Sequence, residues 1–290
     1  MRKAVLGFVA LVLLACSGTA FAQQPPVPSD SRLRTVLDKK VIRVAYRSDA
    51  TPFSFVNDKK EPVGYSIDLC QLVVSSIEQQ YGASGLKIEW VPVTVHTRFA
   101  AIAEDKADIE CGSSTVSLGR MEEVDFSNAI FVESTGVIVA RASNIRTFSD
   151  MNGKRIATVA GTTNERAVMD EINRRKLDMT LLSVKDRDEG VAALEAGSAA
   201  GFASNKLLLL GAQTRRPQDL AMLPDDLSIE SYAIALPRGD WAFRLAVNGA
   251  LARIYRGGGA VEVFRRWFDQ IGLQPGLLID AAYALGGLPD

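Results

Sequence analysis

Short β-rich segments alternate with segments of helical periodicity along most of this chain. The run 41–46 is a predicted strand, and residues 66–80 place apolar side chains at helical spacing. A second series begins with a predicted strand at 155–160, followed by a helix that runs through Arg175. Because parallel strands need crossover connections, which helices supply, this alternation predicts an α/β fold with parallel sheets.

The two series predict two lobes. Residues 32–135 together with 236–275 are expected to form lobe 1, and residues 136–235 are expected to form lobe 2. The chain would cross between the lobes twice, at 132–140, where 136–140 is a predicted strand, and at 230–236. Two such crossings are expected to act as hinge strands beside a ligand cleft. Residues 276–290 are expected to be a C-terminal tail, mobile or draped on the surface.

The first residues have the pattern of a secretory signal. Arg2 and Lys3 precede an apolar run, 4–15, that is too short to span a membrane as an ordinary helix. Ala-Phe-Ala at 20–22 fits a cleavage site, which predicts a signal peptide at 1–22 and a flexible Pro-rich leader at 23–31. The alternative is a lipid-attachment box ending at Cys16. Both interpretations predict export, and the formal net charge of −1 gives no indication of a nucleic-acid partner.

Two cysteines, Cys70 and Cys111, remain after the signal is removed. In an oxidising compartment they could form one disulfide between the first long helix and the strand near 109. They could equally be two buried free thiols, because cysteine packs well as a small hydrophobe. The sequence gives no distance between them, so both interpretations remain open.

Several polar segments could bind an anion. The stretch 107–120 breaks at Gly112 and continues with Ser113, Ser114, Thr115 and, five residues later, Arg120. Hydroxyl and N–H groups after a strand, with an Arg near the next helix start, can hold a carboxylate. The loop 47–55 follows the first strand, at the edge where ligands bind in open α/β sheets. A polar turn with a surface Arg is the alternative interpretation.

Catalytic and cofactor motifs are weak or missing in the sequence. His96 is the only histidine, and no Ser or Cys nucleophile pattern accompanies it. No zinc-ligand spacing, phosphate loop or dinucleotide-binding glycine pattern occurs. We therefore predict no cofactor, no metal and no catalytic residue.

Five motifs occur together in a recognisable order. They are Gly-Tyr-Ser-Ile-Asp at 64–68, Ile-Glu-Cys-Gly-Ser-Ser-Thr at 109–115 with Arg120, Phe-Ser at 126–127, Gly-Thr-Thr at 161–163 and Trp-Phe at 267–268. With them the chain resembles the periplasmic solute-binding proteins of polar amino-acid ABC importers, family 3, and within these the glutamate/aspartate-binding proteins. The resemblance covers roughly residues 31–271.

The resemblance implies a two-lobed periplasmic binding protein fold of type II, acting as a periplasmic monomer that delivers an acidic amino acid to permease subunits in the inner membrane. It implies that Thr115 and Arg120 bind the α-carboxylate, faced from the other lobe by Gly161, Thr162 and Thr163. The side-chain carboxylate would be bound by residues that match Arg47, Arg98 and Ser113.

Two positions depart from the family pattern. Arg187 stands where the family has a His, which keeps a positive charge for an anionic ligand. Asn205 stands where the family has the Asp that binds the α-amino group, so the negative partner of an ammonium is missing. A dicarboxylate or other small anion without an α-amino group is therefore the alternative ligand. A lyase-like enzyme on the same scaffold is a second alternative, and a partner of a receptor a third.

One geometric expectation underlies all of these interpretations. Arg47, Arg98, Arg120 and Arg187 come from four separate segments and should meet in a single crevice. Guanidinium groups would repel one another there, so their convergence would itself indicate an anionic ligand.

Overall fold

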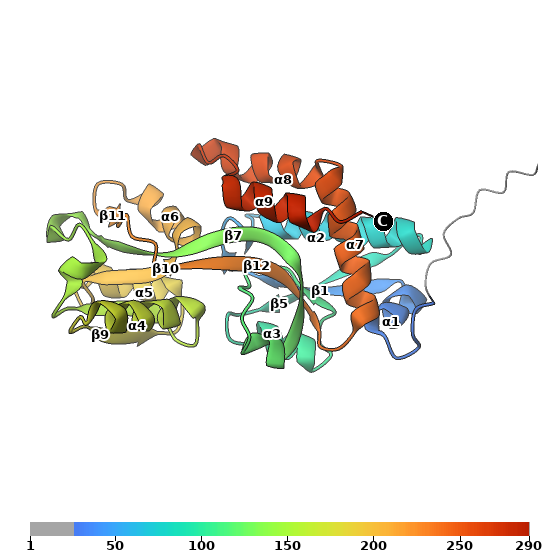
Figure 1. Ribbon diagram of the computed structural model, residues 1–290, viewed down its shortest axis with the longest axis horizontal. Helices are drawn as coiled ribbons and strands as arrows, with labels where there is room; N and C mark the ends of the chain where they lie inside the picture. Colours follow the sequence, from blue (N-terminus) through green and yellow to red (C-terminus); the bar gives the residue numbers. More distant parts are fainter. Residues whose placement is uncertain (1–25, 290) are drawn as a thin grey trace, which may run out of the picture.

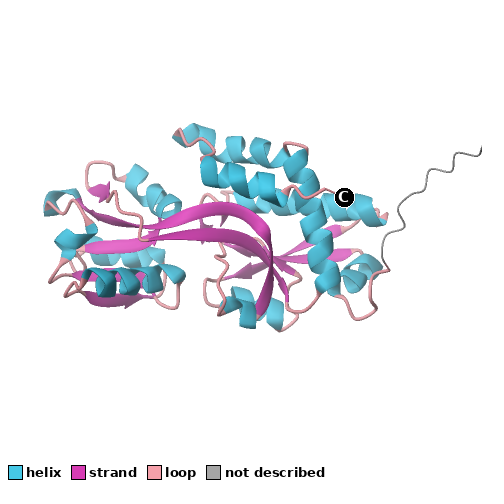
Figure 2. Cartoon of the chain, in the orientation of Figure 1, coloured by secondary structure: helices cyan, strands magenta, loops and turns pink. Residues whose placement is uncertain are grey.

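The computed structural model describes residues 26–289, which form two lobes joined by two long strands (Figure 1). Helices flank the strands in both lobes (Figure 2), so the α/β fold class predicted from the sequence is confirmed. The predicted signal peptide, Cys16 and the first residues of the predicted leader lie outside the described residues.

The first lobe is built on three parallel strands in the order β5, β1, β6, with bounds Lys87–Val93, Val41–Arg47 and Ile109–Glu110. Ile42 and Val44 of β1 face one buried core, and Ala45 faces another. Both faces of this sheet are therefore covered, as expected for parallel strands. The covering helices are α1 (Arg32–Lys39), α2 (Tyr65–Tyr81), α3 (Arg98–Ala103), α7 (Trp241–Arg256) and α8 (Gly259–Phe268).

The two connecting strands are β7 (Val124–Ala140) and β12 (Ser228–Pro237). They pair antiparallel from Val124 opposite Pro237 to Thr135 opposite Ser228. The expected crossings, 132–140 and 230–236, lie within these strands. The sequence predicted a strand only at 136–140, which was too short: β7 continues unbroken from lobe 1 into lobe 2.

The second lobe has three parallel strands in the order β10, β8, β9, with bounds Gly201–Asn205, Arg155–Val159 and Thr180–Val184. The far end of β7 pairs with β10 and with β11 (Leu220–Met222). Its helices are α4 (Thr163–Arg175), α5 (Arg187–Glu195) and α6 (Lys206–Arg215).

Side-chain caps fix where the lobe 2 helices begin. The Thr162 hydroxyl accepts a hydrogen bond from the backbone N–H of Glu165 (3.2 Å), and the Asp186 carboxylate accepts one from that of Glu189 (2.9 Å). Because α4 follows β8 and α5 follows β9, both N-termini lie at the carboxyl edge of the parallel strands. That edge is where α/β folds place their ligands.

The loop 47–55 is more ordered than the sequence indicated. It contributes to a small antiparallel sheet of β2 (Asp49–Ala50), β3 (Ser54–Val56) and β4 (Pro62–Val63). Strands of two or three residues are too short to show a periodic pattern. Gly64 ends this sheet with φ of +136°, and a Cβ there would lie 2.2 Å from the carbonyl oxygen of Phe53.

The C-terminal segment, expected to be either mobile or draped on the surface, forms a helix on the surface of lobe 1 that the sequence did not predict. Residues 277–286 form helix α9 (Leu277–Gly286), which packs on lobe 1 and buries Ile279 and Tyr283. The hydroxyl of Tyr283 contacts that of Tyr65, and its ring stacks on Tyr255 at a centroid distance of 5.0 Å.

Cys70 and Cys111 form a disulfide. It joins α2 to the residue that follows β6, so it anchors the start of the polar segment 112–120 to the lobe 1 core. Among residues 26–289, no helix is both long and apolar enough to cross a membrane.

Candidate functional site

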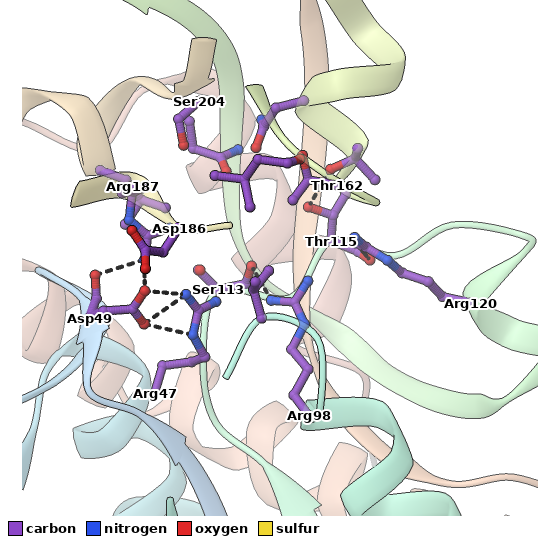
Figure 3. A pocket seen from close by; sticks show the side chains of 16 residues that line it. Arg47, Asp49, Arg98, Ser113, Thr115, Arg120, Thr162, Asp186, Arg187 and Ser204 are labelled. Atoms are coloured by element: carbon purple, nitrogen blue, oxygen red, sulfur yellow. Dashed lines mark hydrogen bonds and ion pairs between the residues drawn. The ribbon is translucent and has the colours of Figure 1, made fainter. Parts of the chain in front are cut away.

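One of the cavities between the lobes is lined by nearly all of the candidate residues (Figure 3). Nine of the ten candidates line it: Arg47, Arg98, Ser113, Thr115, Arg120, Thr162, Thr163, Arg187 and Asn205. The tenth, Gly161, is not among the lining residues, and its N–H donates to the Glu165 carboxylate at 2.9 Å. The four arginines thus meet in one crevice, as the sequence indicated.

Each arginine is placed by the end of an element. Arg47 is the last residue of β1, Arg98 opens α3, Arg187 opens α5 and Arg120 begins a 3₁₀ turn (Arg120–Glu122). Arg47 and Arg98 are only 2% and 3% exposed. Guanidinium groups so far removed from water require an anionic partner.

Asp49 is a partner that sequence reasoning missed. Its carboxylate accepts two hydrogen bonds from Arg47, both 2.7 Å, and one from Arg187 at 3.1 Å (Figure 3). Arg187 also donates to the Asp49 carbonyl at 2.7 Å. Although burial acts to raise it, the pKa of Asp49 is held below its usual value by these two arginines. The position of Asp49, two residues after Arg47, was the available signal.

Arg98 interacts electrostatically with a buried acid, Glu110 at the end of β6. Burial lowers the pKa of Arg98 to about 9; Glu110 opposes this shift, while Arg120 and Arg47 add to it. Burial likewise raises the pKa of Glu110, with Arg98 acting against it. The packing is tight, since a Cβ on Gly112 would lie 2.2 Å from Glu110 Oε1. Glu110 therefore supplies a buried negative charge that favours the charged form of Arg98, without a hydrogen bond between them.

Arg120 reaches the cavity from the polar segment 112–120. Its Nη1 donates to the Thr115 carbonyl at 2.7 Å, and its guanidinium lies 5.2 Å from the centre of the Phe99 ring. Burial lowers the pKa of Arg120, while Glu230 acts to raise it. These contacts hold the guanidinium in place and leave its other N–H groups for a second acceptor.

The hydroxyls of the site divide into two groups. Thr162 has a local role, because its hydroxyl caps α4 and donates to the Val159 carbonyl at 2.7 Å. Thr115 and Thr163 instead come together from the two lobes, with their hydroxyl oxygens 3.4 Å apart. Both donate to the carboxylate of Glu230.

Glu230 is the second residue that sequence reasoning missed. It lies on β12 and is 4% exposed. The sequence marked position 230 only as the start of a chain crossing and gave its side chain no role. A charged residue inside a β-rich hinge segment was the signal that could have identified it.

The two lobes contact each other beside the site. Besides the Arg187–Asp49 contact, Nε2 of His96 in lobe 1 lies 3.2 Å from the Lys185 carbonyl in lobe 2. The cavity has a volume of about 20 Å³, room for roughly one water molecule. A ligand the size of an amino acid therefore enters only if the lobes or the side chains move. In residues 26–289 there is no group of three or more His, Cys, Asp or Glu side chains suited to hold a metal ion.

Comparison with known proteins places the chain in a family. The bacterial extracellular solute-binding proteins, family 3, match residues 42–270. The L-glutamate/L-aspartate-binding protein of Pseudomonas aeruginosa is 32% identical over 268 residues, which cover 90% of this chain and 89% of that protein. The glutamate/aspartate import solute-binding protein of Escherichia coli K12 is 28% identical over 271 residues, covering 92% and 89%.

Solved structures support the fold. An ancestral arginine-binding protein bound to arginine has a TM-score of 0.70 at 22% identity and covers 79% of this chain and 98% of its own. An ancestral amino acid-binding protein that is a precursor of cyclohexadienyl dehydratase has a TM-score of 0.71 at 22% identity, covering 82% and 100%. On the length of the family match and the identity to its members, this chain belongs to the bacterial extracellular solute-binding proteins, family 3.

Proposed function

We propose that this protein is the periplasmic substrate-binding component of an ABC importer and that it binds glutamate or aspartate. The observation that carries the proposal is the cavity, where four arginines and the Thr115–Thr163 pair converge from both lobes. Two carboxylates on one small molecule would satisfy guanidinium groups that otherwise repel one another. The names of three relatives, which are 28–32% identical over most of the chain, agree with this ligand class.

The lowered pKa values support an anionic ligand. Burial and the nearby Arg47 lower the pKa of Arg187 to about 10, and burial lowers that of Arg98 to about 9. Asp49 offsets part of this cost by pairing with Arg47 and Arg187. A ligand carboxylate would replace or extend that pairing. It would stabilise the closed state because it would contact both lobes.

Transport rather than catalysis is the role that we propose. A lyase on this scaffold would need a general acid facing the substrate. The carboxylates that line the cavity, Asp49 and Asp186, are already engaged with Arg47 and Arg187 and with the α5 cap. We further propose that the mature protein starts near Gln23 in the periplasm, acts as a monomer and passes its ligand to permease subunits in the inner membrane.

A thermal-shift panel on the mature chain, residues 23–290, tests this function. L-glutamate or L-aspartate at about 100 times its dissociation constant should stabilise the fold by roughly 2.7 kcal/mol and raise the melting temperature by several degrees. L-arginine, L-glutamine and L-histidine serve as controls and should have no effect. A shift with any of these controls, and none with the two acids, would reject the proposed ligand class.

A further inference from the structure

Glu230 is a buried acid in the connecting strand between the lobes. It lies on the hinge strand β12, directly opposite Glu133 on β7. Its carboxylate is buried behind the cavity, where it contacts residues of both lobes. A carboxylate so far from water needs several donors or a cation.

One oxygen of this carboxylate accepts hydrogen bonds from three residues of the site. Glu230 Oε2 accepts from the Thr115 hydroxyl at 2.6 Å, the Thr163 hydroxyl at 2.9 Å and the Asn205 side-chain amide at 3.2 Å. Thr115 is held beside the hinge by a bridge to Tyr232 of β12. All three donors belong to residues that line the cavity.

The other oxygen fixes the carboxylate in place. Glu230 Oε1 accepts from the hydroxyls of Thr135 and Ser228 at 3.0 and 3.2 Å. Asn164 donates to Thr135 at 2.8 Å and supports this arrangement. Every partner is a donor, as a carboxylate that only accepts requires. The position of Glu230 is therefore set by the protein and does not depend on a ligand.

These contacts decide what the site can offer a ligand. A hydroxyl has one proton, and Thr115 and Thr163 give theirs to Glu230, so toward the cavity each can only accept. The Asn205 amide must turn its Nδ2 to the carboxylate, which leaves Oδ1 as an acceptor. In the part of the chain that the structure describes, no donor reaches that Oδ1. Three acceptors backed by a negative charge match an ammonium, which has three donors.

From this geometry we infer that Glu230 creates the ligand's ammonium site and supplies the negative charge that position 205 lacks. The inference rests on the proposed function and deepens it: the ligand is an α-amino acid, and a dicarboxylate without the amine is rejected. Glu230 is a positioning residue, because it acts through Thr115, Thr163 and Asn205. Asn205 thus takes part in amine recognition even though it carries no charge.

Rejection of the dicarboxylate follows from the same arrangement. Glutarate is glutamate without its amino group, and it would leave the three acceptors facing a group that cannot donate. Sites built to hydrogen-bond a substrate group discriminate strongly against the analogue that lacks it, because buried polar atoms are then unpaired.

Calorimetric titration of the mature chain with L-glutamate and with glutarate tests the inference. The wild-type protein should prefer glutamate by at least roughly 100-fold. Glu230→Gln should weaken glutamate binding by about 10-fold or more, because the negative charge behind the ammonium site is lost. It should also strengthen glutarate binding. The Gln amide donates where the carboxylate accepted, so the Thr115 and Thr163 hydroxyls are free to donate to the ligand. The preference for glutamate over glutarate should therefore be lost or strongly reduced.

Two further variants separate recognition from simple damage to the fold. Glu133→Gln is the control variant, because Glu133 is the buried acid opposite Glu230 on β7 and does not line the cavity. Its Oε1 accepts from the Leu207 backbone N–H. This variant should keep the wild-type preference for glutamate over glutarate. Asn205→Asp places a carboxylate next to Glu230 and should not improve the wild-type protein. In the Glu230→Gln background the same change restores one carboxylate at the site and should recover the preference for glutamate.

The outcomes distinguish the two proposals. If the wild-type protein binds glutamate but Glu230→Gln retains the full preference over glutarate, the inference fails and the proposed function stands. A second outcome is that the double variant folds, as judged by its melting curve, and still shows no preference for glutamate over glutarate. In that case the charge at position 230 is not what selects the amine. Wild-type protein that binds glutarate better than glutamate, or that binds no acid, overturns both.

Discussion

Glu133 shows how one residue of the hinge links stability to pH. Burial, opposed by two backbone N–H donors and reinforced by the nearby Glu230, raises its pKa to about 8. Its carboxyl therefore keeps its proton in the folded state at pH values where the unfolded chain has lost it. Since the folded state binds more protons between about 4.5 and 8, stability falls as pH rises through that window.

We expect Glu133→Gln to remove this dependence. At pH 7 the folded wild-type protein bears a cost on the order of 3 kcal/mol from this group, and the neutral amide bears none. Melting temperatures at pH 5, 6, 7 and 8 provide the measurement. The melting temperature of the variant relative to that of the wild-type protein should rise with each increase in pH. Parallel curves for the two proteins would show that Glu133 does not titrate in this range.

Positive residues of the site were predictable from the sequence, and its acids were not. Arg47, Arg98, Arg120 and Arg187 stand at strand ends or helix starts, where a side chain tends to face a shared edge of the sheet. Glu230 lies inside a strand, so only pairing with β7 shows which way its side chain points. Its partners are up to 115 residues away in sequence, and no local pattern encodes such contacts.

At the scale of elements, the disulfide is the clearest stabilising device. Cys70 in α2 and Cys111 after β6 are separated by 41 residues and are fully buried. Closing a loop of that length restricts the unfolded chain and is expected to contribute about 4 kcal/mol. The sequence could not decide between a disulfide and two free thiols, because that choice depends on a distance between distant segments.

The double variant Cys70→Ala, Cys111→Ala should therefore melt well below the wild-type mature chain. A reductant should lower the melting temperature of the wild-type protein and leave that of the variant unchanged. Titration of the unfolded, unreduced wild-type protein should find no free thiol; two free thiols per chain would contradict the disulfide.

Elements with regular periodicity were predicted well, and those stabilised by tertiary contacts were not. Strand β7 looked interrupted because Glu133, Ser134 and Thr135 are polar. In the fold these residues lie at the lobe junction, where Oε1 of Glu133 accepts from two backbone N–H groups and the Thr135 hydroxyl donates to Glu230. Helix α9 begins after Gly276 without a side-chain cap, so no start signal marked it, and it is held by packing against lobe 1.

Considered as a whole, the molecule brings its two lobes together around a nearly filled site cavity. Asp49 joins Arg47 of one lobe to Arg187 of the other, and Glu230 joins Thr115 of one lobe to Thr163 of the other. The protein's own carboxylates thus bridge the lobes at two places where the resemblance implied ligand carboxylate contacts. Opening must break these contacts, and a ligand that makes better ones with both lobes shifts the population toward its closed complex.

Titration calorimetry with Arg120→Ala tests the central claim most directly, because Arg120 lines the cavity and is half-buried, so its loss should spare the fold. The control is Arg166→Ala on α4, whose side chain is 75% exposed. We predict saturable one-to-one binding of L-glutamate or L-aspartate to the wild-type protein, unchanged affinity in Arg166→Ala and at least roughly 30-fold weaker binding in Arg120→Ala. Equal affinity in all three proteins, or no binding of either acid to the wild-type protein, would contradict this account.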